Sequence, residues 1–240
     1  SHTYTSGGTL SNTVNYTVNN GATLQMGTGA SPATISGSSG TFTLANGATL
    51  GITSTAGVTT TGATGNIQVT GTRTYTAGSN FIYNGTSAQV SGNGLTATNK
   101  GNVTIDNPTS VTLSGSVNIN GNLLIAQGNL NVSASNFAIN VAGNFTNNGS
   151  FTGGTGTVTF SGTAAQALGG TSATTFNAID ISKTAQTLSI NTNAAAASVS
   201  FSASGSTLSV STGITLSISG ALTQNSIANS TAASIITGLG

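Results

Sequence analysis

Residues 103–125 read VTIDNPTSVTLSGSVNINGNLLI and contain four short groups with an apolar residue at every second position. The groups are Val103-Thr-Ile105, Val111-Thr-Leu113, Val117-Asn-Ile119 and Leu123-Leu-Ile125. A period of two is typical of β-strands that bury one face. The groups begin six to eight residues apart, which leaves no room for a helix. Similar groups follow downstream, beginning at Leu130, Phe137, Val158, Ile179, Leu208 and Leu216.

The chain also repeats itself at an interval of about 76–78 residues, a sign of repeat architecture. Residues 75–89 align with 151–166 after one insertion, and residues 137–148 align with 214–225. We therefore predict two copies of one unit at about residues 67–143 and 144–220, degenerate coils over 1–66 and a partial unit over 221–240.

A shorter echo lies upstream, where Val18-Asn-Asn-Gly-Ala-Thr-Leu24 resembles Leu44-Ala-Asn-Gly-Ala-Thr-Leu50. Its period of about 26 fits roughly three times into the longer interval, as expected for solenoid coils of three short strands. The sequence thus predicts an all-β chain, with residues 1–240 forming one right-handed parallel β-helix of roughly 9–11 coils without terminal caps. Tandem β-sandwiches are the alternative, but the close spacing of the groups favours the solenoid.

Charge is scarce, because only 2% of the 240 residues are charged, against about one-quarter in an ordinary domain. A hydrophobic fraction of 36% and only two prolines argue against disorder. The absence of Cys excludes disulfides and thiolate metal sites. A net charge of +1 does not provide the basic surface that nucleic-acid binding requires. No apolar run approaches the ~20 residues of a membrane span.

Asn84-Gly-Thr-Ser-Ala-Gln89 and the segment 143–162 resemble repeats in large secreted proteins of Bacteroidota-type bacteria. Those proteins are similar to the filamentous-haemagglutinin and adhesin class. The resemblance covers about residues 67–225. It implies a β-helix at the bacterial cell surface or outside the cell, and it implies no particular activity.

The residues that could carry catalysis are few. Asp106 and Asp180 are about three coils apart in the sequence, which at ~4.8 Å per coil places them roughly 14 Å apart, too far for a glycosidase pair. His2, the only imidazole, lies near the terminus. Lys100 and Lys183 occupy different places in the two copies, so we expect both to be solvated surface residues. We predict no catalytic, cofactor-binding or metal-binding residue and no cofactor.

Other conspicuous residues are interpreted as structural. Gly153-Gly154 and Gly169-Gly170 lack the lysine and helix of a phosphate loop and are expected to form turns. Asn at the turns can form hydrogen-bonded ladders between stacked coils. We expect five aromatic residues to fill the coil interior: Phe145, Phe151, Phe160, Phe176 and Phe201.

Pairs of threonine on one strand face raise a different possibility, because ranks of hydroxyls on a flat face could order water and bind ice. Threonine is also a good β residue that stacks well, and the pairs do not recur at a fixed period. They are Thr41-Phe-Thr43, Thr53-Ser-Thr55, Thr72-Arg-Thr74, Thr155-Gly-Thr157 and Thr157-Val-Thr159.

The function predicted from these features is structural rather than enzymatic. Solenoid ends expose open strand edges, and almost no charge opposes an approaching copy. We therefore expect an extracellular or cell-surface subunit that stacks head to tail into a filament, with other cells or surfaces as further partners and with neither nucleic acid nor a membrane span. The alternatives are the stalk of a glycan-binding adhesin and an ice-binding solenoid.

Overall fold

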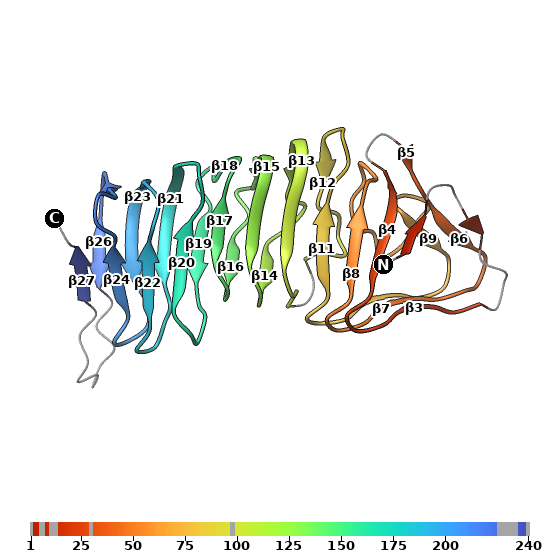
Figure 1. Cartoon of the computed structure of the whole chain (residues 1–240), viewed down its shortest axis with the longest axis horizontal. Coiled ribbons are helices and arrows are strands. Elements are labelled where there is room, and N and C mark those ends of the chain that lie inside the picture. Colours follow the sequence, from red (N-terminus) through yellow and green to blue (C-terminus); the bar gives the residue numbers. More distant parts are fainter. Residues whose placement is uncertain are drawn as a thin grey trace.

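The chain is an all-β solenoid of about nine turns, with roughly three strands per coil, as the sequence predicts (Figure 1). The computed structural model describes residues 2–4, 8–9, 14–28, 31–96, 99–224 and 235–238. Within them there is no helix, and the strands pair in parallel except β4 with β5. Backbone hydrogen bonds between coils therefore run along the long axis of the molecule.

The first strand of each coil belongs to one long sheet, which extends from one end of the molecule to the other. Its path is β1 (His2–Tyr4), β4 (Thr23–Thr28), β8 (Thr49–Ile52), β11 (Asn80–Tyr83), β13 (Val103–Thr112), β15 (Leu123–Asn131), β17 (Phe145–Asn147), β20 (Gln166–Gly169), β22 (Thr187–Ile190), β24 (Thr207–Val210) and β27 (Ile235–Gly238). β5 (Ser31–Pro32), β12 (Gln89–Val90) and β18 (Ser150–Thr152) pair with members of this path.

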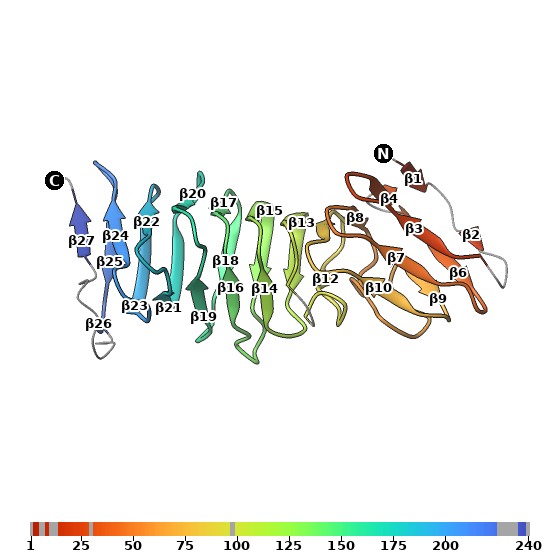
Figure 2. The same cartoon turned by 90° about the horizontal axis from the view of Figure 1, so that it is seen from below.

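The remaining strands form three smaller sheets. Two lie in the N-terminal coils, whose strands are inclined to those that follow (Figure 2). They contain β2 (Gly8–Thr9), β6 (Ile35–Gly37) and β9 (Ile67–Val69), and β3 (Tyr16–Val18), β7 (Phe42–Leu44) and β10 (Arg73–Tyr75). The third contains β14 (Val117–Ile119), β16 (Ile139–Val141), β19 (Thr157–Phe160), β21 (Thr174–Ile181), β23 (Ala194–Phe201), β25 (Leu216–Ile218) and β26 (Leu222–Gln224).

Coil length differs between the two halves of the chain. Leu24 pairs with Leu50, which is the echo seen in the sequence. Val103, however, pairs with Leu123, and Leu123 pairs with Phe145, so these coils are only 20 and 22 residues long. The expectation of one coil period throughout the chain is therefore wrong. Compact Gly-Asn corners close the later coils, whereas longer connections interrupt the N-terminal ones.

As a consequence, the repeat interval of the sequence is not a whole number of coils. Residues 103–105 lie in a first strand, β13, whereas the matching residues 179–181 lie in the third-strand part of β21. The local pairing is nevertheless the same, because Phe81 pairs with Val103 as Val158 pairs with Ile179. The matching residues of the second copy thus lie two faces further round the solenoid, in third strands instead of first strands.

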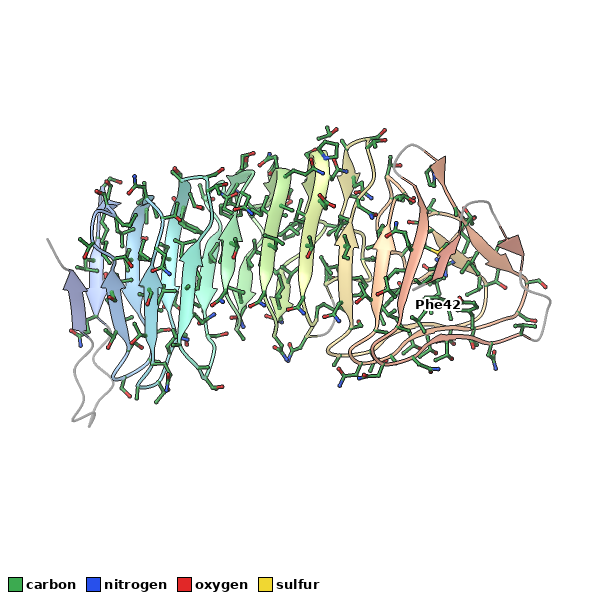
Figure 3. The ribbon with its side chains drawn as sticks, viewed as in Figure 1. Phe42 is labelled. Atoms are coloured by element: carbon green, nitrogen blue, oxygen red, sulfur yellow. The ribbon has the colours of Figure 1, made fainter. Side chains whose placement is uncertain are left out.

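The interior is filled by alternate side chains of the strands (Figure 3). In the N-terminal coils Phe42 lies between Tyr16 and Tyr75, with ring centroids 6.0 Å apart on each side. The predicted aromatic core is confirmed for four residues and partly for Phe151, which packs against the core while half-buried. The four are Phe145, Phe160, Phe176 and Phe201.

An asparagine ladder follows one corner of the solenoid. The side-chain oxygen of Asn80 accepts a hydrogen bond from the backbone N–H of Asn102, which does the same for Asn122, and Asn122 for Asn144. Glycine precedes three of these residues. At Gly121 the corner leaves no room for a side chain, because a Cβ there would meet the backbone carbon of Gly101 at 2.7 Å. The ladder fixes the register of successive coils and has a structural role, as predicted for Asn at the turns.

Candidate functional site

Three of the five charged side chains are buried, which corrects the expectation that the lysines are solvated. Lys100 is 1% exposed, Lys183 is 0% exposed and Arg73 is 6% exposed. Burying a charge is costly unless hydrogen bonds compensate it. The acceptors around each cation therefore decide what these residues do.

Lys183 closes a tight loop that ends at Gln166. Its Nζ donates to the side-chain oxygen of Gln166 at 2.6 Å and to the carbonyls of Ala164 and Gly162 at 2.7 and 2.8 Å. The Gln166 oxygen also accepts the backbone N–H of Gly162 at 3.0 Å. The Gln166 amide donates to the carbonyls of Val141 and Gly143 at 3.0 and 2.5 Å. Three adjacent coils are thereby joined through one glutamine.

The same arrangement recurs in the other sequence copy with an asparagine in place of the lysine. Gln89 accepts the N–H of Gly85 at 3.1 Å and donates to two carbonyls of the coil before it. Asn107 donates to the Gln89 oxygen at 2.9 Å and to the Ser87 carbonyl at 2.7 Å. Asn107 aligns with Lys183 in the repeat and forms two of the three equivalent hydrogen bonds without charge. Lys183 is therefore a structural residue.

Lys100 lies where the N-terminal coils meet the shorter ones. Its Nζ is 3.4 Å from the carbonyl oxygen of Tyr75 and 5.5 Å from the ring centroid of Phe81. Its backbone forms a bridge to Ile119. Burial lowers the pKa of Lys100 and of Lys183 to about 8. The low pKa in each case reflects desolvation.

Arg73 organises an exposed loop. Nε donates to the Val69 carbonyl at 2.9 Å, and Nη1 donates to the hydroxyl of Thr59 at 2.8 Å. Further bonds reach the carbonyls of Thr59, Thr61 and Gly62. Burial lowers the pKa of Arg73, an effect that nearby Tyr75 opposes, and a guanidinium remains charged throughout the working range of proteins.

The structure does not bring the two aspartates together. Asp106 lies in β13 and accepts a hydrogen bond from Gln127 at 2.7 Å. Asp180 lies in β21, several coils further along, and accepts hydrogen bonds from Ser200 and Ser202 of the following coil. The backbone of His2 is in β1 and its side chain is outside the described part. The described residues contain no group of three or more His, Cys, Asp or Glu suited to a metal.

Two of the five threonine pairs stack in register, although their spacing in the sequence is irregular. Thr43 pairs with Thr17 on one side and with Thr74 on the other. Thr41 and Thr72 precede the same strands and form a second rank. Thr17, Thr72 and Thr74 are exposed on this sheet. The neighbouring rings of Tyr16, Phe42 and Tyr75 lie beneath it. A three-strand hydroxyl face thus exists in the N-terminal coils.

Each end of the described solenoid has three parallel strands that pair on one side only. At one end these are β1, β2 and β3, which pair with β4, β6 and β7. At the other end they are β25, β26 and β27, which pair with β23, β23 and β24. Leu222 of β26 is 50% exposed. A hollow of about 330 Å³ between β3 and β4 is lined in part by Tyr16, Val18 and Leu24.

No protein-family model, curated protein or solved structure matches this chain. The described residues include no helix long and apolar enough to cross a membrane.

Proposed function

We propose that the chain is a non-enzymatic structural protein of the bacterial surface or extracellular space, whose coils stack head to tail with those of other copies. The observation that carries this proposal is the presence of open strand edges at both ends. β27 and β1 are the two end strands of one long sheet, and at each end two further parallel strands, β25 and β26 or β2 and β3, have one open edge. Open parallel edges readily accept further strands.

Continuing the register of the third strands defines one contact of this junction. β26 of one copy would pair with β3 of the next, because both are third strands that precede a first strand. Leu222 would then lie beside Tyr16, and Thr223 beside Thr17. This arrangement covers a half-exposed leucine with the lining of the hollow and continues the apolar core across the junction.

The distribution of charge supports the same proposal. Three of the five charges lie in the interior, and Asp180 is tied to two serines. Neither β3 nor β26 contains a charged residue. An approaching copy therefore meets hydroxyls, amides and apolar groups, and little electrostatic repulsion opposes contact.

Electron microscopy of the purified chain at neutral pH tests this proposal. We expect filaments one solenoid wide. Leu222→Glu should shorten them greatly, because it places a charge in the junction. Val90→Glu is the matched control, since Val90 is 42% exposed but lies between the ends. Only monomers from the unaltered chain would refute the proposal, and equal shortening by both variants would argue against the junction described.

Ice binding is a second candidate, favoured by one observation: Thr17, Thr43 and Thr74 lie in register on three neighbouring strands. Regularly spaced hydroxyl and methyl groups on a rigid surface could order water. Inhibition of ice recrystallisation by the unaltered chain, and its loss in Thr43→Lys but not in Thr159→Lys, is the expected result. No inhibition by the unaltered chain would eliminate this candidate.

A further inference from the structure

A second hollow, of about 260 Å³, lies beside the loop that Arg73 holds. It is independent of the proposed stacking, because the coil that contains β9 and β10 begins with β8, which is paired on both sides and is at neither end of the solenoid. Its lining combines hydroxyl, amide and methyl groups with one cation. The lining residues are Thr60, Thr61, Gly62, Ala63, Gln68, Val69, Thr70, Gly71 and Arg73.

The guanidinium of Arg73 has donor capacity that the loop does not use. Arginine has five N–H donors, two of them on Nη2. Among the described residues, Nη2 donates only to the carbonyl of Gly62, whereas Nη1 has three acceptors. One Nη2 donor therefore has no partner in the described part of the chain. A donor without a partner beside a hollow favours a ligand that completes its hydrogen bonds.

The positive charge is also uncompensated. The acceptors of Arg73 are four carbonyls and one threonine hydroxyl, and none is a carboxylate. Carbonyl dipoles stabilise the cation in part, but an anion would do so more strongly, and guanidinium binds carboxylate with matched geometry. The hollow is the route by which such a group can approach.

The remainder of the lining suits a sugar ring. The hydroxyls of Thr60 and Thr61 and the amide of Gln68 offer donors and acceptors, while Ala63 contributes apolar surface. Sugars present hydroxyl edges and apolar C–H faces together. Thr61 and Ala63 are exposed, so the hollow opens on the surface of the solenoid.

We propose that this hollow binds a carboxylate-bearing sugar residue, such as a uronic acid of an extracellular polysaccharide, with Arg73 holding the carboxylate. The ligand is therefore an acidic glycan, and each protein chain binds one of its sugar residues. Because the charge of Arg73 supplies the recognition, binding should weaken as salt is added. The neutral sugar of the same stereochemistry should bind far less well.

Calorimetric titration with trigalacturonate, and with galactotriose as the neutral probe, tests the site. We expect one trigalacturonate site per chain and roughly tenfold or greater loss of affinity in Arg73→Gln. Ala63→Trp should also abolish binding by filling the hollow while leaving Arg73 and its loop contacts in place. Lys183→Asn removes a cation that does not line this hollow and should leave affinity unchanged.

Four results would overturn the proposal: no binding by the unaltered chain, equal binding of the neutral probe, equal affinity in Ala63→Trp, or equal loss in Lys183→Asn. Inorganic sulfate serves as a third probe, and sulfate binding without trigalacturonate binding would overturn it as well. If Arg73→Gln melts earlier than the unaltered chain, Ala63→Trp decides the outcome. Filament formation is measured on the same samples and does not bear on these titrations.

Discussion

The two glutamine-closed loops, Gly85–Gln89 and Gly162–Gln166, have the same hydrogen bonds and differ in the residue that completes them. In the first loop Asn107 donates to the glutamine oxygen, and in the second Lys183 does so. A neutral amide and a buried ammonium therefore occupy one structural position. The comparison teaches that the charge of Lys183 is not required at this position, where a donor to the glutamine oxygen serves the fold.

The loops also differ in what the closing residue can accept. The side-chain oxygen of Asn107 accepts the backbone N–H groups of Thr109 and Ser110 at 2.7 and 3.1 Å. A lysine has no acceptor. The turn after Lys183 instead contains Ala185 with a φ of 53°, a left-handed conformation that is uncommon outside glycine. The two copies thus reach the same closure by different turns.

The largest difference between the loops should appear when the glutamines are removed. Gln166→Leu takes an acceptor from a buried ammonium and from the Gly162 N–H, and it removes the amide donor to the Gly143 carbonyl, so we expect a loss of about 3–5 kcal/mol in unfolding free energy. Gln89→Leu affects only neutral partners and should cost about 2–3 kcal/mol. Urea denaturation measures both. Equal losses would show that the charge does not matter.

Exchanging the closing residues should be asymmetric. Asn107→Lys loses the acceptor for Thr109 and Ser110 and should cost about 2 kcal/mol. The measurement is again urea denaturation, with the midpoint converted to an unfolding free energy by using one m-value for both chains. A stability equal to that of the unaltered chain would contradict the assigned role of the Asn107 oxygen.

The pH dependence of stability separates the buried lysines from the amides. In the folded chain the pKa of Lys100 and of Lys183 is lowered to about 8 by burial, from 10.5. Between these values the unfolded chain binds more protons, so unfolding free energy should rise with pH, by at most about 1.4 kcal/mol per unit and lysine, less where water screens the charge. Below pH 8 this contribution should be flat.

Two buried tyrosines set the pH above which stability no longer rises. Burial raises the pKa of Tyr75 and Tyr83 above the ordinary value of 10. Above pH 10 the unfolded chain therefore loses protons that the folded chain retains, and stability should fall. Thermal melts across pH 7–11 should show a maximum between these limits. A maximum at or below pH 7 would be inconsistent with the burial of the lysines.

The smallest effect is expected for Lys183→Asn, which copies the first loop into the second. It should cost about 1 kcal/mol or less at pH 7, because an uncharged donor replaces a desolvated cation. It should also reduce the rise in stability above pH 8. Lys183→Met is the control, because it removes the donor altogether and should cost more.

The sequence was sufficient to predict the solenoid, because apolar residues at every second position, separated by Gly and Asn, define short stacked strands. It did not predict coil length. The echo at Leu24 and Leu50 describes one pair of coils, whereas corners such as Gly121-Asn122 shorten the later ones. For the same reason the stacking of Thr43 on Thr74 was missed, since those coils differ in length from the rest.

The buried cations were also missed, and here a signal existed. Asn107 and Lys183 align in the two sequence copies, and each follows the glutamine of a Gly-Thr-Ser/Ala-Ala-Gln segment at nearly the same distance along the chain. A lysine that aligns with a turn asparagine is a candidate for the same hydrogen bonds. No such sequence signal predicts the hydrogen bonds of Arg73 to the loop at Thr59, because they depend on the tertiary path of residues 53–66.

The most direct test of the central claim, head-to-tail stacking, places charges at the predicted junction of Thr223 with Thr17. A chain carrying both Thr17→Glu and Thr223→Glu brings like charges together at every junction. We expect it to remain monomeric in sedimentation at neutral pH, whereas Thr17→Lys with Thr223→Glu should restore filaments. Filaments in both variants, or in neither while the unaltered chain polymerises, would contradict the junction.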